Sequence, residues 1–326
     1  MERLAPNEVW LDVIVLFAGL RVEGQIELAP DVRIEQILEA NLVAQAALTA
    51  ADVILQRQSD ADAPAHPVNG MRYRVRGKRL VDGSEYRINH ELIEAPKRAF
   101  RRAAALLQGS AAVGDGGTFV IATDQAGASR YYSRQFNFGN LSVHYDGPYF
   151  GPNNEDELRR VFAFLQDPYL SGEGTQIGVA IDRLGFAPTR ANDVDVNLDL
   201  CVAAEIAFSF GPKKIKNEEL SQTLRDNAAA FFGDGEFFWD RATVYQILRD
   251  SYKERSDTVH GRAGHGAERD KLGGLNAQLR ELMARVLLAY VERRPTKRAA
   301  KTTWPDRRQA VKDGTPLPPI FIPPAP

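Results

Sequence analysis

The hydrophobic periodicity of the chain changes near Asp193, and this change constrains the fold more than any other feature of the sequence. Before Asp193, strand-like runs alternate with turns rich in Gly, Asn and Asp. From Asp193 to about Arg293, apolar residues recur at helical spacing without strand signals. A length of 326 residues also exceeds what one core usually supports. We therefore predict an α+β N-terminal domain over residues 1–188 and an all-α helical bundle over residues 189–294.

The N-terminal region contains both strand-like and helix-like segments. The strand-like runs are Val9–Phe17, Met71–Val75, Thr118–Ile121 and Gln176–Ile181. The helical stretches are Pro96–Gln108, with proline in its first turn, and Glu155–Gln166, which follows the turn-forming sequence GPNN. This mixture indicates an α+β domain, to which we assign a sensor or regulatory role.

Four helices are expected in the second domain. The first, Val196–Phe210, is apolar on nearly every side, so it should lie at the buried centre of the bundle. Glu205 is the one charged residue deep in this helix, and a buried carboxylate needs a cationic partner, for which Arg255 is the candidate. The other three helices are expected at about Glu218–Phe232, Glu236–His260 and Glu268–Arg293.

The last segment, residues 295–326, is rich in Pro, Lys and Arg and ends in the sequence PLPPIFIPPAP. Proline disfavours helix and this composition cannot form a core, so we expect a disordered tail. A solvated tail is the simplest interpretation of its basic residues, with nucleic-acid contact as the alternative. These residues are Lys297, Arg298, Lys301, Arg307, Arg308 and Lys312.

Composition excludes several classes of function. Forty-one Lys and Arg against 43 Asp and Glu give a net charge of −2, so no overall field draws the chain to nucleic acid or to an anionic membrane. Cys201 is the only cysteine, which rules out internal disulfides and zinc sites built on a cysteine pair, and favours a reducing cytoplasm.

Neither a membrane anchor nor a metal centre is expected. The apolar run Val13–Leu20 is far shorter than the roughly 20 residues that span a bilayer, and no signal peptide precedes it. His66, His90 and His144 are widely separated and show no ligand spacing, so we expect no metal and no other cofactor.

The end of the third helix carries the motif most specific for chemistry. Residues 252–261 read YKERSDTVHG, which resembles the R-x4-6-H signature of HEPN domains and most closely that of the Apea-like branch. Two upstream segments resemble the first and second helices of that branch: residues 197–208, NLDLCVAAEIAF, which contain Glu205, and residues 219–233, ELSQTLRDNAAAFFG. Three motifs in order, spanning roughly a third of the chain from Ile177 to Arg293, are more specific than one.

The resemblance implies a helical bundle that forms a homodimer and cleaves RNA without a metal. In that reaction the 2′-hydroxyl attacks the adjacent phosphate, which leaves a 2′,3′-cyclic phosphate and a 5′-hydroxyl. Arg255 and His260 would be the catalytic residues, with Glu205 and Asp257 supporting them. The resemblance also implies a toxin or an antiviral defence protein, with an antitoxin or another defence protein as partner.

The residue types suit this hydrolase chemistry independently of the family. Histidine changes charge near neutrality and can relay a proton, and the arginine fork can hold a dianionic phosphorane. Residues five positions apart on a helix differ by roughly 140° in direction, so Arg255 and His260 do not share one face. We therefore expect the site to be completed by a second copy of the chain.

Both residues also have an interpretation without catalysis. The helix dipole favours a histidine at position 260, and Arg255 could simply pair with Glu254, Asp257 or Glu205. The alternative function is therefore a non-catalytic HEPN module that binds RNA or a partner protein.

Further basic residues are candidates for RNA binding. Arg262 lies in a glycine-rich loop after the motif, and Lys213 and Lys214 follow the first helix. A stripe with i, i+1, i+4, i+5 spacing begins near Pro96, although a solvated outer face remains the default interpretation. The stripe consists of Lys97, Arg98, Arg101 and Arg102.

Overall fold

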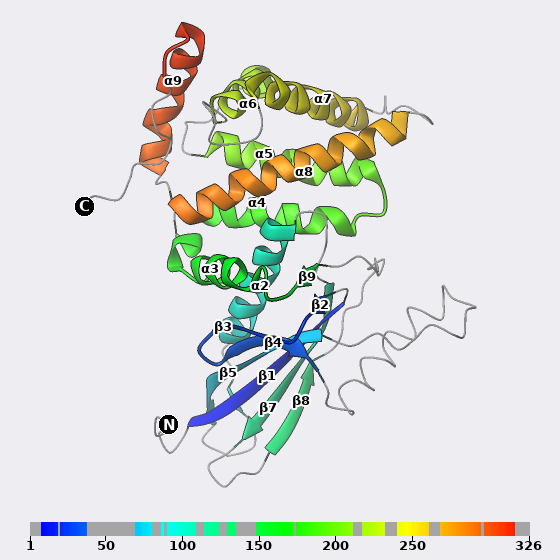
Figure 1. Cartoon of the computed structure of the whole chain (residues 1–326), viewed down its shortest axis with the longest axis vertical. Coiled ribbons are helices and arrows are strands. Elements are labelled where there is room, and N and C mark those ends of the chain that lie inside the picture. Colours follow the sequence, from blue (N-terminus) through cyan, green and yellow to red (C-terminus); the bar gives the residue numbers. More distant parts are fainter. Residues whose placement is uncertain are drawn as a thin grey trace. The chain divides into compact units, whose positions relative to one another are not determined.

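A computed structural model describes residues 8–18, 20–37, 69–79, 86–87, 90–108, 114–123, 129–134, 148–172, 174–210, 217–231, 240–260, 268–294 and 297–316. The chain divides into two compact units (Figure 1). The first consists of Met1–Ala104 and Ala111–Gln166, and the second of Ala105–Ser110 and Asp167–Pro326. The first is α+β and the second is mostly helical, as the change in periodicity predicts.

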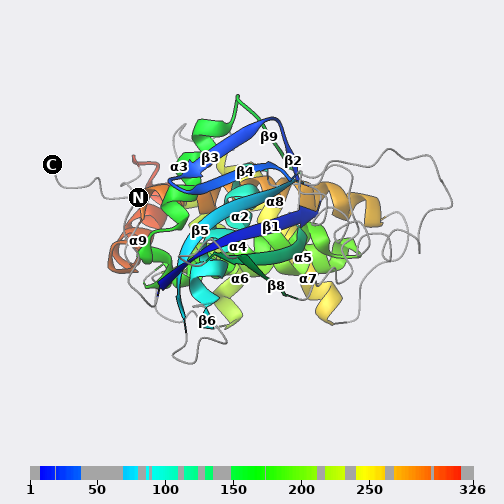
Figure 2. The same cartoon turned by 90° about the horizontal axis from the view of Figure 1, so that it is seen from below.

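The first unit is built on an antiparallel sheet. Within the described residues the sheet has seven strands in the order β3-β4-β5-β1-β7-β8, and β6 pairs with β5. Figure 2 shows several of these strands side by side. Their bounds are β1 Glu8–Ala18, β3 Gln25–Ala29, β4 Val32–Gln36, β5 Asn69–Arg79, β6 Tyr86–Arg87, β7 Gly114–Thr123 and β8 Ser129–Arg134. A separate parallel pair joins β2 (Arg21–Val22) to β9 (Tyr149–Phe150).

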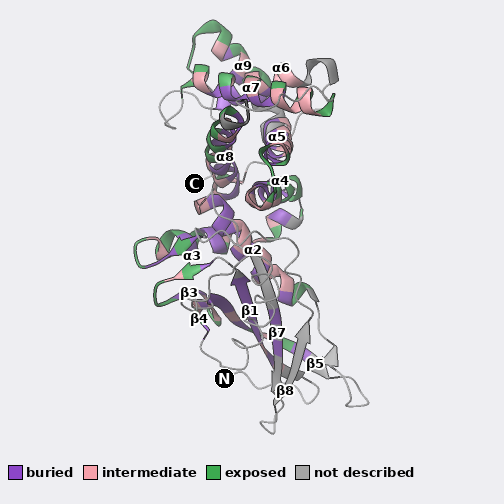
Figure 3. Cartoon of the chain, turned by 90° about the vertical axis from the view of Figure 1, so that its right-hand side faces the viewer, coloured by how far each residue is buried: buried purple, intermediate pink, exposed green. Residues whose placement is uncertain are grey.

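The expected strands Val9–Phe17, Met71–Val75 and Thr118–Ile121 are confirmed as β1, β5 and β7. Leu11 and residues 13–17 of β1 are buried (Figure 3). Helix α2 (His90–Gln108) packs on the sheet, since the Tyr73 hydroxyl donates to the Ile93 carbonyl and the rings of Phe17 and Phe100 lie 5.0 Å apart. Helix α3 (Glu155–Leu165) packs against β3, where Arg159 Nε donates to the Glu27 carbonyl over 2.8 Å.

The second unit is a bundle around a buried helix. Its helices are α4 Thr175–Phe186, α5 Asp193–Ser209, α6 Asn217–Phe231, α7 Arg241–Val259, α8 Glu268–Arg293 and α9 Lys297–Asp313. Helix α5 contacts α4, α6, α7 and α8, and Leu200, Ala204 and Phe208 on it are fully buried. The four expected helices are confirmed as α5 to α8, with α7 described from Arg241.

The expected strand Gln176–Ile181 is wrong, because these residues lie in α4. The buried residues of α4 include Ile177, Ala180, Ile181 and Leu184, which recur at i, i+3, i+4 and i+7 and form one helical face. Helix α4 packs against α5 and α8, and it belongs to the second unit within Asp167–Pro326.

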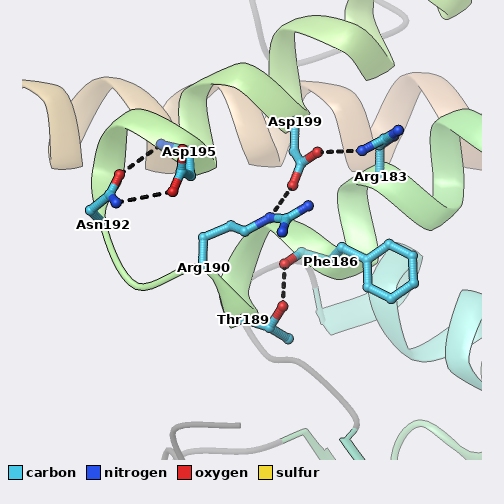
Figure 4. A network of polar contacts seen from close by, with 7 residues as sticks. All are labelled: Arg183, Phe186, Thr189, Arg190, Asn192, Asp195 and Asp199. Atoms are coloured by element: carbon cyan, nitrogen blue, oxygen red, sulfur yellow. Dashed lines mark hydrogen bonds and ion pairs between the residues drawn. The ribbon is translucent and has the colours of Figure 1, made fainter. Parts of the chain in front are cut away.

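A buried carboxylate fixes the corner between α4 and α5 (Figure 4). Asp199 on α5 is only 5% exposed and accepts hydrogen bonds from Arg183 Nη1 at 2.9 Å and Arg190 Nε at 2.5 Å. The side chain of Asn192 accepts from the backbone amide of Asp195 over 2.9 Å and caps the start of α5. These contacts join the two helices across the short 3-10 turn Ala187–Thr189.

The expected disordered tail is a helix, α9, over Lys297–Asp313. Trp304 is buried and its Nε1 donates to the Phe210 carbonyl over 3.2 Å, at the end of α5. Arg307 Nε donates to the Ala230 carbonyl over 2.7 Å, near the end of α6. The last carbonyls of a helix lack intrahelical partners, so α9 satisfies acceptors that α5 and α6 leave open. Residues 317–326 lie outside the described part of the chain.

Candidate functional site

An ion pair between α7 and α5 forms the centre of the candidate site. Arg255 Nη1 contacts Glu205 Oε1, as expected from the isolated carboxylate on α5, and this pairing is confirmed. The two side chains are 30% and 22% exposed, so neither charge is sealed from solvent. The Arg255 guanidinium carbon also lies 5.7 Å from the centre of the Tyr252 ring, one turn earlier on α7.

Glu205 ends a row of polar side chains along α5. Asn197, Cys201 and Glu205 recur at every fourth position and therefore share one face of the helix. Asn197 Nδ2 donates to Asn276 Oδ1 on α8 over 3.1 Å. The Cys201 thiol lies 3.6 Å from Asn197 Oδ1 and 3.7 Å from the Ser251 carbonyl on α7. The row links α5 to α8 and α7 and ends at the ion pair.

Two buried groups beside Glu205 stay uncharged. Burial raises the pKa of the Cys201 thiol to about 12. Burial, followed by the negative charge of Glu205, raises the pKa of the Tyr252 phenol well above its usual value. The Tyr252 hydroxyl donates to the Cys201 carbonyl over 3.4 Å. Negative charge in this part of the bundle is thus concentrated on Glu205, opposite Arg255.

Tyr252 and Cys201 lie beside the ion pair, and the sequence analysis did not predict this. The signal was the spacing of Asn197, Cys201 and Glu205, because three polar or soft side chains at intervals of four on an apolar helix indicate a polar seam. The motif in residues 252–261 places Tyr252 one turn before Arg255, which brings its ring under the guanidinium.

His260 lies at the C-terminal cap of α7 and is exposed. Its backbone amide donates to the Ser256 carbonyl over 3.0 Å, which closes the last turn of the helix. The preceding Val259 is 66% exposed. The helix therefore presents an imidazole at an open end, where the dipole favours a positive charge. As expected, both Arg255 and His260 reach the surface of the unit.

The second unit contains four other candidate residues, and the structure describes one of them. Asp257 is half-buried on α7. Arg262, Lys213 and Lys214 lie outside the described residues.

The basic stripe on α2 is not the open face that its spacing indicated. Lys97 is 7% exposed and its Nζ lies 2.9 Å from Glu94 Oε2. Arg98 pairs with Glu91, and Arg101 and Arg102 are half-buried. The packing of α2 turns part of the stripe toward the protein.

The described residues contain no group of three His, Cys, Asp or Glu side chains that could hold a metal ion. None of the described helices has both the length and the apolar character needed to cross a membrane.

Comparison of the chain with protein-family models, with curated proteins and with solved structures gives no match.

Proposed function

We propose that the protein is a metal-independent endoribonuclease in which Arg255 and His260 act on the scissile phosphate. The observation that carries the proposal is the geometry at the end of α7. Arg255 is held by Glu205 yet remains partly exposed, and five residues later His260 is exposed at the helix terminus. A fixed guanidinium can stabilise the charge of the phosphorane, and an accessible imidazole can transfer the protons of internal phosphate transfer.

The reaction forms a bond between the 2′-oxygen and phosphorus and breaks the bond between phosphorus and the 5′-oxygen. His260 takes the proton from the 2′-hydroxyl as this bond forms, and the protonated imidazole of His260, in the same or the second copy, gives a proton to the leaving 5′-oxygen. The Arg255 guanidinium has five N–H donors. Glu205 accepts a hydrogen bond from one of its terminal nitrogens, so the other donors can stabilise the phosphorane. Glu205 fixes the orientation of the guanidinium.

A homodimer completes the site in this proposal. Arg255 and His260 differ by roughly 140° in direction around α7, so one copy presents them on different faces. Two copies related by a two-fold axis can combine an arginine from one with a histidine from the other. The exposed apolar side chain of Val259 supports contact at this end of α7.

The resemblance to HEPN domains supports a cellular role for the same chemistry. We propose a cytoplasmic enzyme that is toxin-like or acts in antiviral defence. Its N-terminal unit senses a trigger or restrains cleavage. Its partner is an antitoxin or another defence protein. Expression of the wild-type chain should then slow growth of the host, whereas the His260→Ala chain should not.

The direct experiment measures cleavage of a labelled RNA in the presence of EDTA. His260→Ala and Arg255→Ala should each lower the rate by roughly two to four orders of magnitude with the fold intact. Lys253→Ala and Arg249→Ala serve as matched controls, because each changes an exposed cationic side chain on the same helix. Control variants as inactive as the site variants would show that the effect is not specific to the proposed pair.

A non-catalytic HEPN module is the second candidate, and one observation favours it. Glu205 already neutralises Arg255 within one protomer, so the pair could serve only to hold α7 on α5. This candidate predicts RNA or protein binding without cleavage by the wild-type chain. Cleavage that persists in EDTA and is lost in His260→Ala would exclude it.

A further inference from the structure

We infer that the sheet of the first unit binds single-stranded RNA on the face that carries Trp10, Arg74 and Arg76. The choice of RNA rather than DNA rests on the proposed function, whereas the binding itself does not depend on catalysis. The described strands of the seven-stranded sheet hold nine Lys and Arg against five Asp and Glu, although the whole chain has a net charge of −2.

Strand β5 supplies most of this positive charge. Its sequence, NGMRYRVRGKR, contains five Lys and Arg and no acidic residue. Alternate residues of a strand point to the same side, so Arg72, Arg74 and Arg76 share one face. Tyr73 points to the opposite face, where its hydroxyl donates to the Ile93 carbonyl of α2. The arginine row therefore lies on the side of the sheet away from α2, and Arg74 and Arg76 are exposed.

Trp10 on the neighbouring strand β1 lies within this row. The register pairs Trp10 with Arg76 and Asp12 with Arg74 across the two strands. The guanidinium carbons of Arg76 and Arg74 lie 5.4 Å and 5.9 Å from the centre of the indole ring. Trp10 is half-buried, which leaves part of its side chain accessible.

Carboxylates on this face limit the arginines that are available for a ligand. Glu35 on β4 pairs with Arg72 and Arg33, so these two arginines contribute least. Asp12 accepts from Arg74 Nε at 2.7 Å, and Asp31 acts on Arg74 through its charge. The Asp12 contact uses one edge of the guanidinium, whose terminal nitrogens carry further donors. Arg74 and Arg76 are the exposed arginines of the row, so a ligand meets these two first.

This combination of groups fits a single strand of nucleic acid. Guanidinium groups bind phosphate and also stack on bases, and an indole gives a flat surface for a base. Proteins that bind single strands join positively charged side chains to aromatic side chains on which bases stack, with little dependence on sequence. A free phosphate would use the arginines but would gain nothing from Trp10.

The test measures binding of a fluorescent 12-nucleotide 2′-O-methyl oligouridylate to the full chain by anisotropy, because this strand lacks the hydroxyl needed for cleavage. The double variant Arg74→Gln/Arg76→Gln removes two phosphate contacts. Its plot of log affinity against log salt should be shallower by about 1.4, and its Kd in 0.1 M salt should rise about 25-fold. Trp10→Leu should raise Kd at least about fivefold without changing the salt slope.

The control is Arg160→Gln/Arg285→Gln, which removes two surface arginines that also form ion pairs, on α3 and α8. It should bind as the wild type does, and thermal unfolding checks that each variant is folded. Wild-type affinity in Arg74→Gln/Arg76→Gln would overturn the inference, as would binding to anionic phospholipid vesicles with no binding to the oligouridylate.

Cleavage of unmodified oligouridylate is measured in parallel, so that the two proposals fail separately. Binding that Arg74→Gln/Arg76→Gln weakens, with no cleavage by the wild-type chain, would support the RNA-binding surface and refute the proposed ribonuclease. If Arg74→Gln/Arg76→Gln changes neither binding nor cleavage, the RNA-binding surface is refuted and the ribonuclease proposal stands.

Discussion

The Glu205–Arg255 ion pair should contribute measurably to the stability of the helical unit. The perturbation is a double-mutant cycle of Glu205→Gln, Arg255→Met and the two together. The side chains are 22% and 30% exposed, which places the pair between exposed pairs, worth about 0.2–1 kcal/mol, and buried pairs, whose disruption costs about 3–5 kcal/mol. We expect each single change to cost about 2 kcal/mol, with a coupling energy of about 1–2 kcal/mol.

The order of the two single variants is also predicted. Arg255→Met removes both the ion pair and the cation–π contact with Tyr252, which is worth about 0.5–1 kcal/mol at such sites. It should therefore destabilise the unit more than Glu205→Gln does.

The assay follows urea unfolding through the reaction of Cys201 with a thiol reagent. Cys201 is the only cysteine of the chain, is buried and lies one turn before Glu205, so the readout reports on this unit alone. The matched control is the exposed Arg285–Glu281 pair on α8, where a coupling of only about 0.3–0.5 kcal/mol is expected. A Glu205–Arg255 coupling energy no larger than that of this control would show that partial burial does not strengthen the ion pair.

Three further outcomes follow from buried groups. Trp304→Ala should destabilise the helical unit by about 3–5 kcal/mol in the same urea assay, because the indole is 1% exposed and holds α9 in place. Asp199→Asn should cost about 2 kcal/mol, since it removes the charge that Arg183 and Arg190 share; a loss below about 0.5 kcal/mol would contradict the role of Asp199 at this corner. Because burial holds the pKa of Cys201 at about 12, the native thiol should stay protonated at pH 8 and react at least 100-fold more slowly than in urea, as rates with a chromogenic disulfide can show.

The helical unit was the more predictable part of the fold. Helix α5 could be placed because a run of apolar residues on nearly all sides is typical of a buried helix. Gln176–Ile181 was misassigned because a short apolar run fits a buried strand and a buried helix equally well. Only its packing on α5 and α8 identifies it as part of α4.

The C-terminal helix could not be predicted from composition. Proline and basic residues indicated disorder, but Trp304, Arg307 and Ala310 recur at intervals of three and are all buried. The energy that orders α9 comes from burial of the indole and from carbonyls at the ends of other helices, which local sequence does not reveal.

In the candidate site, the partner of Glu205 was predictable and the orientation of α2 was not. A carboxylate in the apolar second half of α5 requires a cation, and the motif supplies Arg255 nearby. Spacing alone identifies the stripe that contains Lys97 but not the side of α2 that faces the protein. Tertiary packing decides this, and it buries Lys97 beside Glu94.

Two substrates that differ by one oxygen atom test most directly whether the 2′-hydroxyl is the nucleophile. An RNA with a single cleavage site and its analogue with 2′-deoxyribose at the scissile position are incubated with the wild-type chain in EDTA, and the product ends are identified by mass spectrometry. Internal attack with Arg255 and His260 predicts 2′,3′-cyclic phosphate and 5′-hydroxyl ends from the RNA, and no cleavage of the analogue. Undiminished cleavage of the analogue, or cleavage that occurs only with added Mg²⁺, would contradict attack by the 2′-hydroxyl at this site.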